Sequence, residues 1–211
     1  MADYISKYKT QMAVGIVWLF HISAIIGILI GNQEWFIAKT PLNLSICLLL
    51  FLIIYPINTL KKGIVFCIFY VGGMLAEWLG VQYGILFGEY SYGINFGPKL
   101  DGVPYLIGAY WSLLTFITAG ILDYFDLKIW LKVFLSASLM VTLDFFMEHS
   151  APIFNFWEFN GGVAPLENYG TWFIIALLFQ VILRILKIEG NKMYGTHLYF
   201  AQILFFLVFF L

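Results

Sequence analysis

Three acidic residues lie in apolar surroundings: Glu77 in the run MLAEWLGV, and Asp144 and Glu148 in TLDFFMEHS. Each lies within or at the end of a stretch long enough to cross a bilayer, where a charged group is unfavourable and usually marks a functional site. Asp144 and Glu148 are four residues apart, so a helix would place them on one face. Carboxyl groups brought together at low dielectric cannot all ionise, and we expect at least one to keep its proton at neutral pH. Such an acid can protonate an alkene, relay protons or bind a cation.

Aromatic residues are concentrated beside these acids, in the segments FGEYSYGINFG and APIFNFWEFNGG and in the neighbouring apolar stretches. An aromatic belt at the membrane interface accounts for most of them. Aromatic faces also attract cations, so a neutral acid among aromatic rings suits carbocation chemistry on a hydrocarbon. The residues with a candidate role in substrate binding are Tyr90, Tyr92, Trp111, Trp157, Trp172, Glu89 and Asn168.

Asn168 opens one of the predicted spans, so we expect it to cap that helix; alternatively it holds a water or orients a carboxylate. His21 lies in the middle of a predicted span, where we expect a hydrogen-bonded packing role. Cys47 and Cys67 are interpreted as buried apolar residues without a disulfide between them. Three histidines are too few for a histidine-rich di-iron site, and the sequence indicates neither a metal nor a cofactor.

The composition is typical of an integral membrane protein, with 62% hydrophobic and 11% charged residues, against about 25% charged residues in soluble domains. No basic patch with interleaved aromatics suggests a nucleic-acid partner. We expect a single membrane domain over residues 1–211, an all-α bundle, because helices satisfy the backbone in lipid. Spans of about 20 apolar residues are predicted at Met12–Ile30, Leu42–Asn58, Ile64–Gly80, Val103–Leu122, Ile129–Met147, Gly170–Leu186 and Met193–Leu211, which makes about seven transmembrane helices.

Lysine and arginine are distributed unevenly between the two sides of this arrangement. Lys39 and Lys99 fall on one side, with the longer loops 81–102 and 149–169, and nine cations fall on the other. The bias predicts a cytoplasmic N-terminus, an outer C-terminus and a site facing the outer leaflet of the inner (cell) membrane. The nine are Lys7, Lys9, Lys61, Lys62, Lys128, Lys132, Arg184, Lys187 and Lys192.

Part of the sequence resembles a known family, in two blocks at Glu77–Trp111 and Leu143–Trp172. In these blocks the chain resembles the membrane-bound carotenoid-biosynthesis family that includes the carotenoid 1,2-hydratases of bacteria and archaea. His149 departs from the proline expected after the glutamate. The features that look alike are Glu77, Gly80, Gly84, Phe87-Gly88, Tyr90, Tyr92, Gly102-Val103-Pro104, Trp111, Asp144, Glu148, Trp157, Pro165, Asn168 and Trp172.

The resemblance implies a cofactor-independent hydro-lyase that adds water across the terminal C1=C2 bond of an acyclic carotenoid end group. It implies a linear or monocyclic C40 carotenoid and water as substrates, with membrane lipid and other enzymes of the carotenoid pathway as possible partners. Asp144 or Glu148 is the expected proton donor, and Glu77 is the expected ion partner or water base. These roles are not assigned further by the residues alone.

Two other functions remain open at this stage. A carotenoid cyclase of the lycopene type would begin with the same protonation, but an internal alkene would replace water as the nucleophile. A proton-coupled transporter would use the buried acids as a relay, although neither repeated halves nor interrupted helices are evident.

Overall fold

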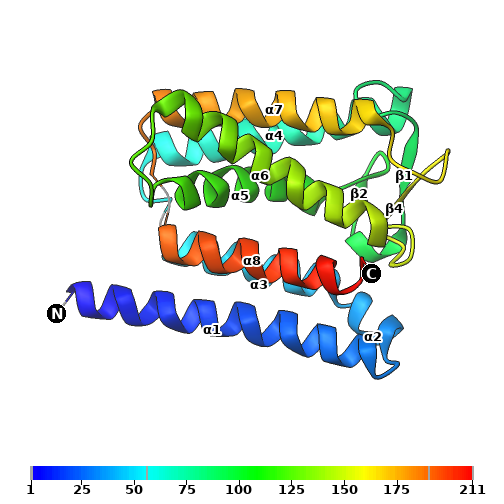
Figure 1. The fold of residues 1–211 in the computed structure, drawn as a ribbon, viewed down its shortest axis with the longest axis horizontal. Helices are drawn as coiled ribbons and strands as arrows, with labels where there is room; N and C mark the ends of the chain where they lie inside the picture. Colours follow the sequence, from blue (N-terminus) through cyan, green and yellow to red (C-terminus); the bar gives the residue numbers. More distant parts are fainter. Residues whose placement is uncertain (1, 56, 190, 211) are drawn as a thin grey trace.

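The computed structural model describes residues 2–55, 57–189 and 191–210, which form a bundle of antiparallel helices (Figure 1). The all-α prediction is confirmed, and seven of the helices are long. The helices are α1 (Ala2–Leu29), α2 (Gln33–Ile37), α3 (Thr40–Ile54), α4 (Leu60–Tyr83), α5 (Tyr105–Leu122), α6 (Ile129–Ser150), α7 (Leu166–Ile185) and α8 (Lys192–Val208).

Within the described residues, six spans are long and apolar enough to cross a membrane, one of them the stretch from α2 through α3. α8 has 17 residues, one fewer than the shortest of these spans, α5. The bounds differ from the predicted ones most at the start of α1, which begins at Ala2 instead of Met12, and next around Asn58. α3 ends at Ile54, and the Thr59 side chain caps α4 by accepting a hydrogen bond from the Lys62 backbone, so α4 begins before Ile64.

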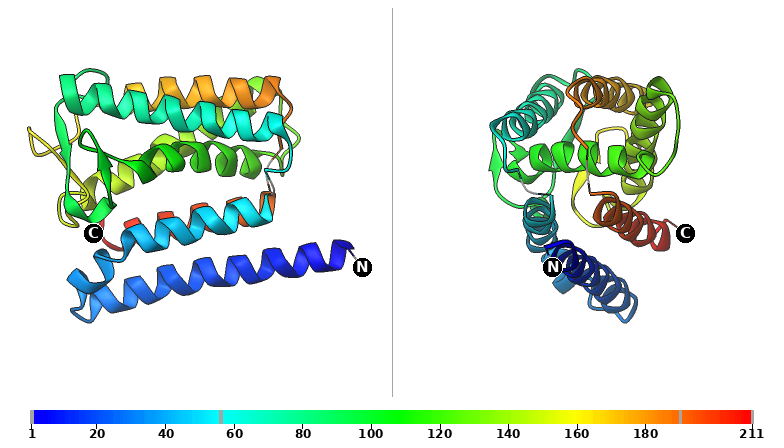
Figure 2. Two further views of the ribbon diagram at one scale, coloured as in Figure 1. Left: turned by 180° about the vertical axis from the view of Figure 1, so that it is seen from behind. Right: turned by 90° about the vertical axis from the view of Figure 1, so that its left-hand side faces the viewer.

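α5 forms the centre of the bundle and contacts α3, α4, α6, α7 and α8. Nearly all of its side chains are buried, and many are small, such as Gly108 and Ala109. Small residues let helix backbones approach closely within a membrane. Its hydroxyl residues bond to backbone carbonyls, for example Thr115 Oγ1 to Trp111 O at 2.8 Å. α4 and α7 cover one side of α5, α3 and α8 cover the other, and α1 lies outermost against α8 and α3 (Figures 1 and 2).

The two ends of the bundle differ in charge. The N-terminus lies at one end and the C-terminus at the opposite end (Figure 1). The starts of α1, α4, α6 and α8 and the end of α7 share the first end, and these segments carry the nine lysines and arginines that the sequence places together. We call this the basic end. The other end, which holds the four strands and the C-terminus, is called the acid end.

The long loops at the acid end contain short strands that the sequence did not predict. β1 (Tyr90–Tyr92) pairs antiparallel with β4 (Trp157–Phe159), and β2 (Lys99–Leu100) pairs with β3 (Val103–Pro104). A 3₁₀ turn, η1 (Ile94–Phe96), follows β1. The register joins Tyr90 to Phe159 and Tyr92 to Trp157. The pairing therefore fastens the loop after α4 to the loop after α6.

Candidate active site

The three predicted acids converge at the acid end, although they come from different helices. Glu77 on α4 and Asp144 and Glu148 on α6 line the same small cavity of about 20 Å³. A cavity of about 10–15 Å³ or more on this measure can hold one water molecule when polar groups surround it. The rest of its lining comprises Phe87, Tyr90, Tyr92, Ile107, Met147, Trp157, Phe159, Asn168 and Trp172.

Glu77 is buried and accepts three hydrogen bonds from neutral side chains. Its Oε2 accepts from the hydroxyls of Tyr90 at 2.5 Å and Tyr92 at 2.6 Å, and its Oε1 accepts from Trp111 Nε1 at 2.9 Å. Three donors directed at one carboxylate satisfy its anionic form. This arrangement suits a fixed negative charge within an otherwise apolar site.

Two glycines on the same face of α4 make room for the partners of Glu77. A Cβ at Gly73 would lie 2.6 Å from the Trp111 side chain, and one at Gly80 would lie 2.8 Å from the Tyr90 ring. Real Cβ atoms do not approach so closely, so these positions need glycine for the rings to reach the carboxylate. With Glu77 between them at helical spacing, the motif Gly73-x3-Glu77-x2-Gly80 forms one wall of the site.

Asp144 and Glu148 are joined by Asn168 of α7. The Asn168 Nδ2 donates to Asp144 Oδ2 at 3.0 Å and to Glu148 Oε1 at 3.2 Å. The predicted capping role of Asn168 is wrong: Pro165 is at the N-cap position, and Asn168 lies inside the first turn of α7 with its amide turned to the acids. The alternative role, orienting a carboxylate, is confirmed. Glu148 has a second donor, Trp157 Nε1 at 2.9 Å, and is half-buried, whereas Asp144 is fully buried.

The β1–β4 pairing brings the donors from the two loops to one face. Side chains of a strand alternate between its faces, so Tyr90 and Tyr92 of β1 point inward with Trp157 of β4, while Ser91 and Glu158 are exposed. Burial raises the pKa of both tyrosines well above its usual value, and the negative charge of Glu77 raises it further. Both hydroxyls therefore remain donors across the whole physiological pH range.

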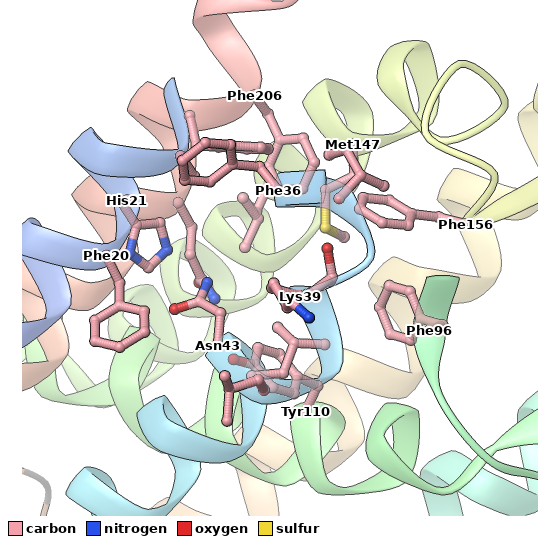
Figure 3. Close-up of a pocket in the computed structure, with 18 of the residues that line it drawn as sticks. Phe20, His21, Phe36, Lys39, Asn43, Phe96, Tyr110, Met147, Phe156 and Phe206 are labelled. Carbon is pink, nitrogen blue, oxygen red and sulfur yellow. The ribbon is translucent and has the colours of Figure 1, made fainter. Parts of the chain in front are cut away.

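A second, much larger cavity adjoins the acid cavity, and its lining is mostly apolar (Figure 3). It has a volume of about 520 Å³, within the range of about 300–1,000 Å³ usual for small-molecule sites. Ile107, Met147 and Trp172 line both cavities. The Trp172 and Trp111 rings stack at the boundary, with centroids 3.8 Å apart. An extended hydrocarbon in the large cavity can thus present one end to the acids.

Not every predicted residue lies in this arrangement. Glu89 is exposed outside the cavity, where its carboxylate accepts a hydrogen bond from Asn160 at 2.8 Å. His149, taken from the sequence as a loop residue, lies in the last turn of α6 and packs against Phe210. Cys67 is exposed on α4 rather than buried, and Cys47 is buried and free. His21 has the expected hydrogen bond, to the Val17 carbonyl at 2.8 Å.

Sequence reasoning found Trp172 but missed Ile107 and Met147, the other two residues that line both cavities. Met147 follows Asp144 by three positions, so helical spacing placed it on the same face and offered a signal. Ile107 gave no such signal, because an isoleucine in an apolar helix is equally expected against lipid. The contribution of α1 and α2 to the large cavity was also missed, since it depends on how whole helices pack.

With the site defined, comparison with known proteins identifies the family. Residues 41–211 match the family model described as "Carotenoid biosynthesis protein". The chain belongs to this family. No curated protein and no solved structure matches the chain. The match includes every acid of the site and begins after α1 and α2, so those two helices lie outside the matched region. Membership places the protein in carotenoid biosynthesis and in a membrane.

Proposed function

We propose that this family member is a carotenoid hydratase, which adds water across the terminal C1=C2 bond of an acyclic carotenoid end group. The observation that carries the proposal is the water-sized cavity bounded by three carboxyl groups and joined to a large apolar cavity. Hydration of an alkene needs a proton, a stabilised cation and one positioned water, and a polyene needs an apolar chamber. The two cavities supply these requirements side by side.

The hydrogen bonds support a division of roles among the acids. Glu77, with three donors, is the permanent anion. Asp144 is the more deeply buried of the two acids on α6, and its one donor, the Asn168 amide, is shared with Glu148. Asp144 is therefore the best candidate for the protonated acid. Glu148 is less buried and has two donors, so it suits a base that exchanges protons with the outside.

The proposed reaction consists of a proton transfer to the alkene, the attack of a water and the return of a proton to Asp144. Asp144 transfers its carboxyl proton to C2: the π pair of the alkene forms the new C–H bond, the O–H electrons stay on the Asp144 carboxylate, and a tertiary cation remains at C1. The charge of Glu77 and the faces of Trp111 and Trp172 stabilise that cation. A water in the acid cavity attacks C1, its oxygen forms the new C–O bond, and its proton passes to Glu148. Transfer of that proton back to Asp144 restores the starting state.

Neutral donors are important for this cycle. All hydrogen bonds to the three carboxylates in the described residues come from tyrosine, tryptophan or asparagine side chains. A fixed cation in contact with Asp144 would hold it ionised and unable to protonate an alkene. The asparagine amide orients Asp144 without supplying such a charge.

Expression in a bacterium that accumulates lycopene or γ-carotene, followed by mass analysis of its pigments, tests the proposal. The expected product has the mass of the substrate plus one water, and Asp144→Asn removes it while the protein remains in the membrane. A product of unchanged mass with a new ring would replace the hydratase by a cyclase. Unaltered pigments, together with carotenoid-independent proton flux in liposomes, would favour a transporter.

A further inference from the structure

The large cavity contains polar groups that the proposed reaction does not use. His21 of α1 and Gln202 of α8 both line it, and both are buried, with exposed fractions of 4% and 6%. Neither residue lines the acid cavity. His21 packs edge-on against Phe205, one turn after Gln202 on α8, with ring centroids 6.5 Å apart. The two polar side chains therefore belong to the same part of the α1–α8 wall.

Both side chains present hydrogen-bond acceptors. Gln202 Oε1 is buried without a hydrogen-bond partner. His21 Nδ1 bonds to the Val17 carbonyl, so Nδ1 carries the proton and Nε2 is left as an acceptor. Gln202 Oε1, as a buried acceptor without a donor, is therefore unfavourable. A ligand that brings an O–H group into the cavity would remove that penalty, whereas a pure hydrocarbon would not.

His21 lies at a distance from the acid cavity. In Figure 3, His21 is on one side of the large cavity, and Met147 and Phe156 are on the other. Since Met147 also lines the acid cavity, the reacting end of a bound chain and His21 lie on different sides of the large cavity. His21 is on α1, outside the region matched by the family model. The matched region by itself therefore does not contain this acceptor.

We propose that the cavity binds an isoprenoid that already carries a hydroxyl group, and that Gln202 Oε1 accepts a hydrogen bond from it, with His21 as the neighbouring acceptor. This inference rests on the proposed function for the reacting end and adds the class of molecule: a hydroxylated chain with its hydroxyl away from the reacting double bond. Gln202 and His21 are thus residues that determine specificity.

Binding of matched alcohols and hydrocarbons to the purified full-length protein tests the inference. Geraniol, farnesol and geranylgeraniol place a hydroxyl at increasing distance from the dimethyl end, and each is compared with the hydrocarbon in which CH₃ replaces CH₂OH. Fluorescence of Trp111 and Trp172, at the cavity boundary, reports binding. At the chain length that fits, we expect the alcohol to bind about tenfold or more tightly than its hydrocarbon, because unpaired acceptors discriminate against a ligand without a donor.

The Gln202→Leu variant removes the acceptor at similar volume. It should abolish the preference for the alcohol and still bind the hydrocarbon, which also shows that it is folded. Phe200→Leu, on the exposed side of α8, is the matched control and should keep the preference. Equal affinity for alcohol and hydrocarbon at every length in the wild-type protein would overturn the inference, as would a preference that survives Gln202→Leu.

The two proposals fail separately. A protein that prefers the alcohol but hydrates no carotenoid would retain this inference and lose the proposed function. A protein that hydrates a carotenoid but binds alcohol and hydrocarbon equally would lose this inference alone.

Discussion

Carboxylates at the two ends of the bundle have opposite surroundings. At the basic end, Asp123 Oδ1 forms ion pairs with Arg184 at 2.5 Å and Lys132 at 3.6 Å. At the acid end, the donors to Glu77, Asp144 and Glu148 are neutral. Both ion pairs found in the described residues involve Asp123. Asp123 thereby links α5, α6 and α7 through two cations, whereas the donors to the three acids at the other end carry no charge. A carboxylate therefore holds helices together at the basic end, whereas carboxyl groups transfer protons at the acid end on our proposal.

The largest effect should come from removing Asp144, the proton donor that we propose. Asp144→Asn should lower hydration by about 10²–10⁴-fold, the usual contribution of a general acid, because asparagine cannot supply the proton to C2. The measurement is the rate of hydroxycarotenoid formation in membranes with equal amounts of protein. Asp123→Asn is the matched control at the basic end and should retain the reaction; equal losses in both variants would end the distinction between the two ends.

Removal of the carboxylate that we propose as the permanent anion should have the next largest effect. Glu77→Gln keeps the shape but replaces one acceptor oxygen with an NH₂ group that faces its former donors, so hydration should fall by about 10²-fold, comparable to the loss of one electrostatic contact to a transition state. Glu158→Gln, on the exposed face of β4, is the control. If Glu77→Gln lowered only protein abundance and left turnover per molecule unchanged, Glu77 would be a structural residue.

Loss of a single tyrosine donor should have a smaller effect and should alter the response to alkali. Tyr92→Phe removes one hydrogen bond to Glu77 and should destabilise the protein by about 1–3 kcal/mol, the range for a bond to a charged group. In the wild type, the raised pKa of Tyr92 means that the folded state keeps a proton that the unfolded state loses above about pH 10. Stability should therefore be full below pH 10 and fall as the pH rises beyond it.

Thermal unfolding in detergent as a function of pH measures this effect. The fall in stability above pH 10 should be less steep in Tyr92→Phe than in the wild type. Tyr124→Phe, an exposed tyrosine near the basic end, should leave the slope unchanged. An identical slope in all three proteins would show that Tyr92 titrates normally in the fold.

The smallest effect should come from Trp157→Phe, which removes the donor to Glu148 Oε2 but keeps an aromatic ring. Glu148 retains its bond from Asn168, so hydration should fall by about 3–10-fold, corresponding to a modest hydrogen-bond contribution of about 1 kcal/mol. Trp130→Phe, exposed at the start of α6, is the control. A loss as large as that of Asp144→Asn would mean that Glu148, rather than Asp144, supplies the proton.

Local patterns predicted a large part of the site. The i, i+4 spacing brought Asp144 and Glu148 together correctly, because it depends on one helix alone. The matching depth of Glu77 placed it near them, because α4 and α6 both start at the basic end and have similar lengths of 24 and 22 residues. The segregation of lysine and arginine likewise predicted which helix ends lie together (Figure 1).

Long-range packing explains what the sequence did not predict. Tyr90, Tyr92 and Trp111 were recognised as candidates, but their convergence on Glu77 depends on the β1–β4 register and on two close contacts to glycines of α4. The capping interpretation of Asn168 was wrong because its partners are on another helix. The large cavity was missed because apolar side chains face both lipid and the protein interior, so hydrophobicity does not separate the two in a membrane.

The β1–β4 pairing also constrains how the protein matures. The two strands are separated by more than sixty residues, which include all of α5 and α6, and ladders between such distant segments form late in folding. Until both strands have reached the same side of the bilayer, Tyr90 and Tyr92 are not held against Glu77 by this pairing. A newly made chain would therefore be inserted first and complete the hydrogen bonds of Glu77 afterwards.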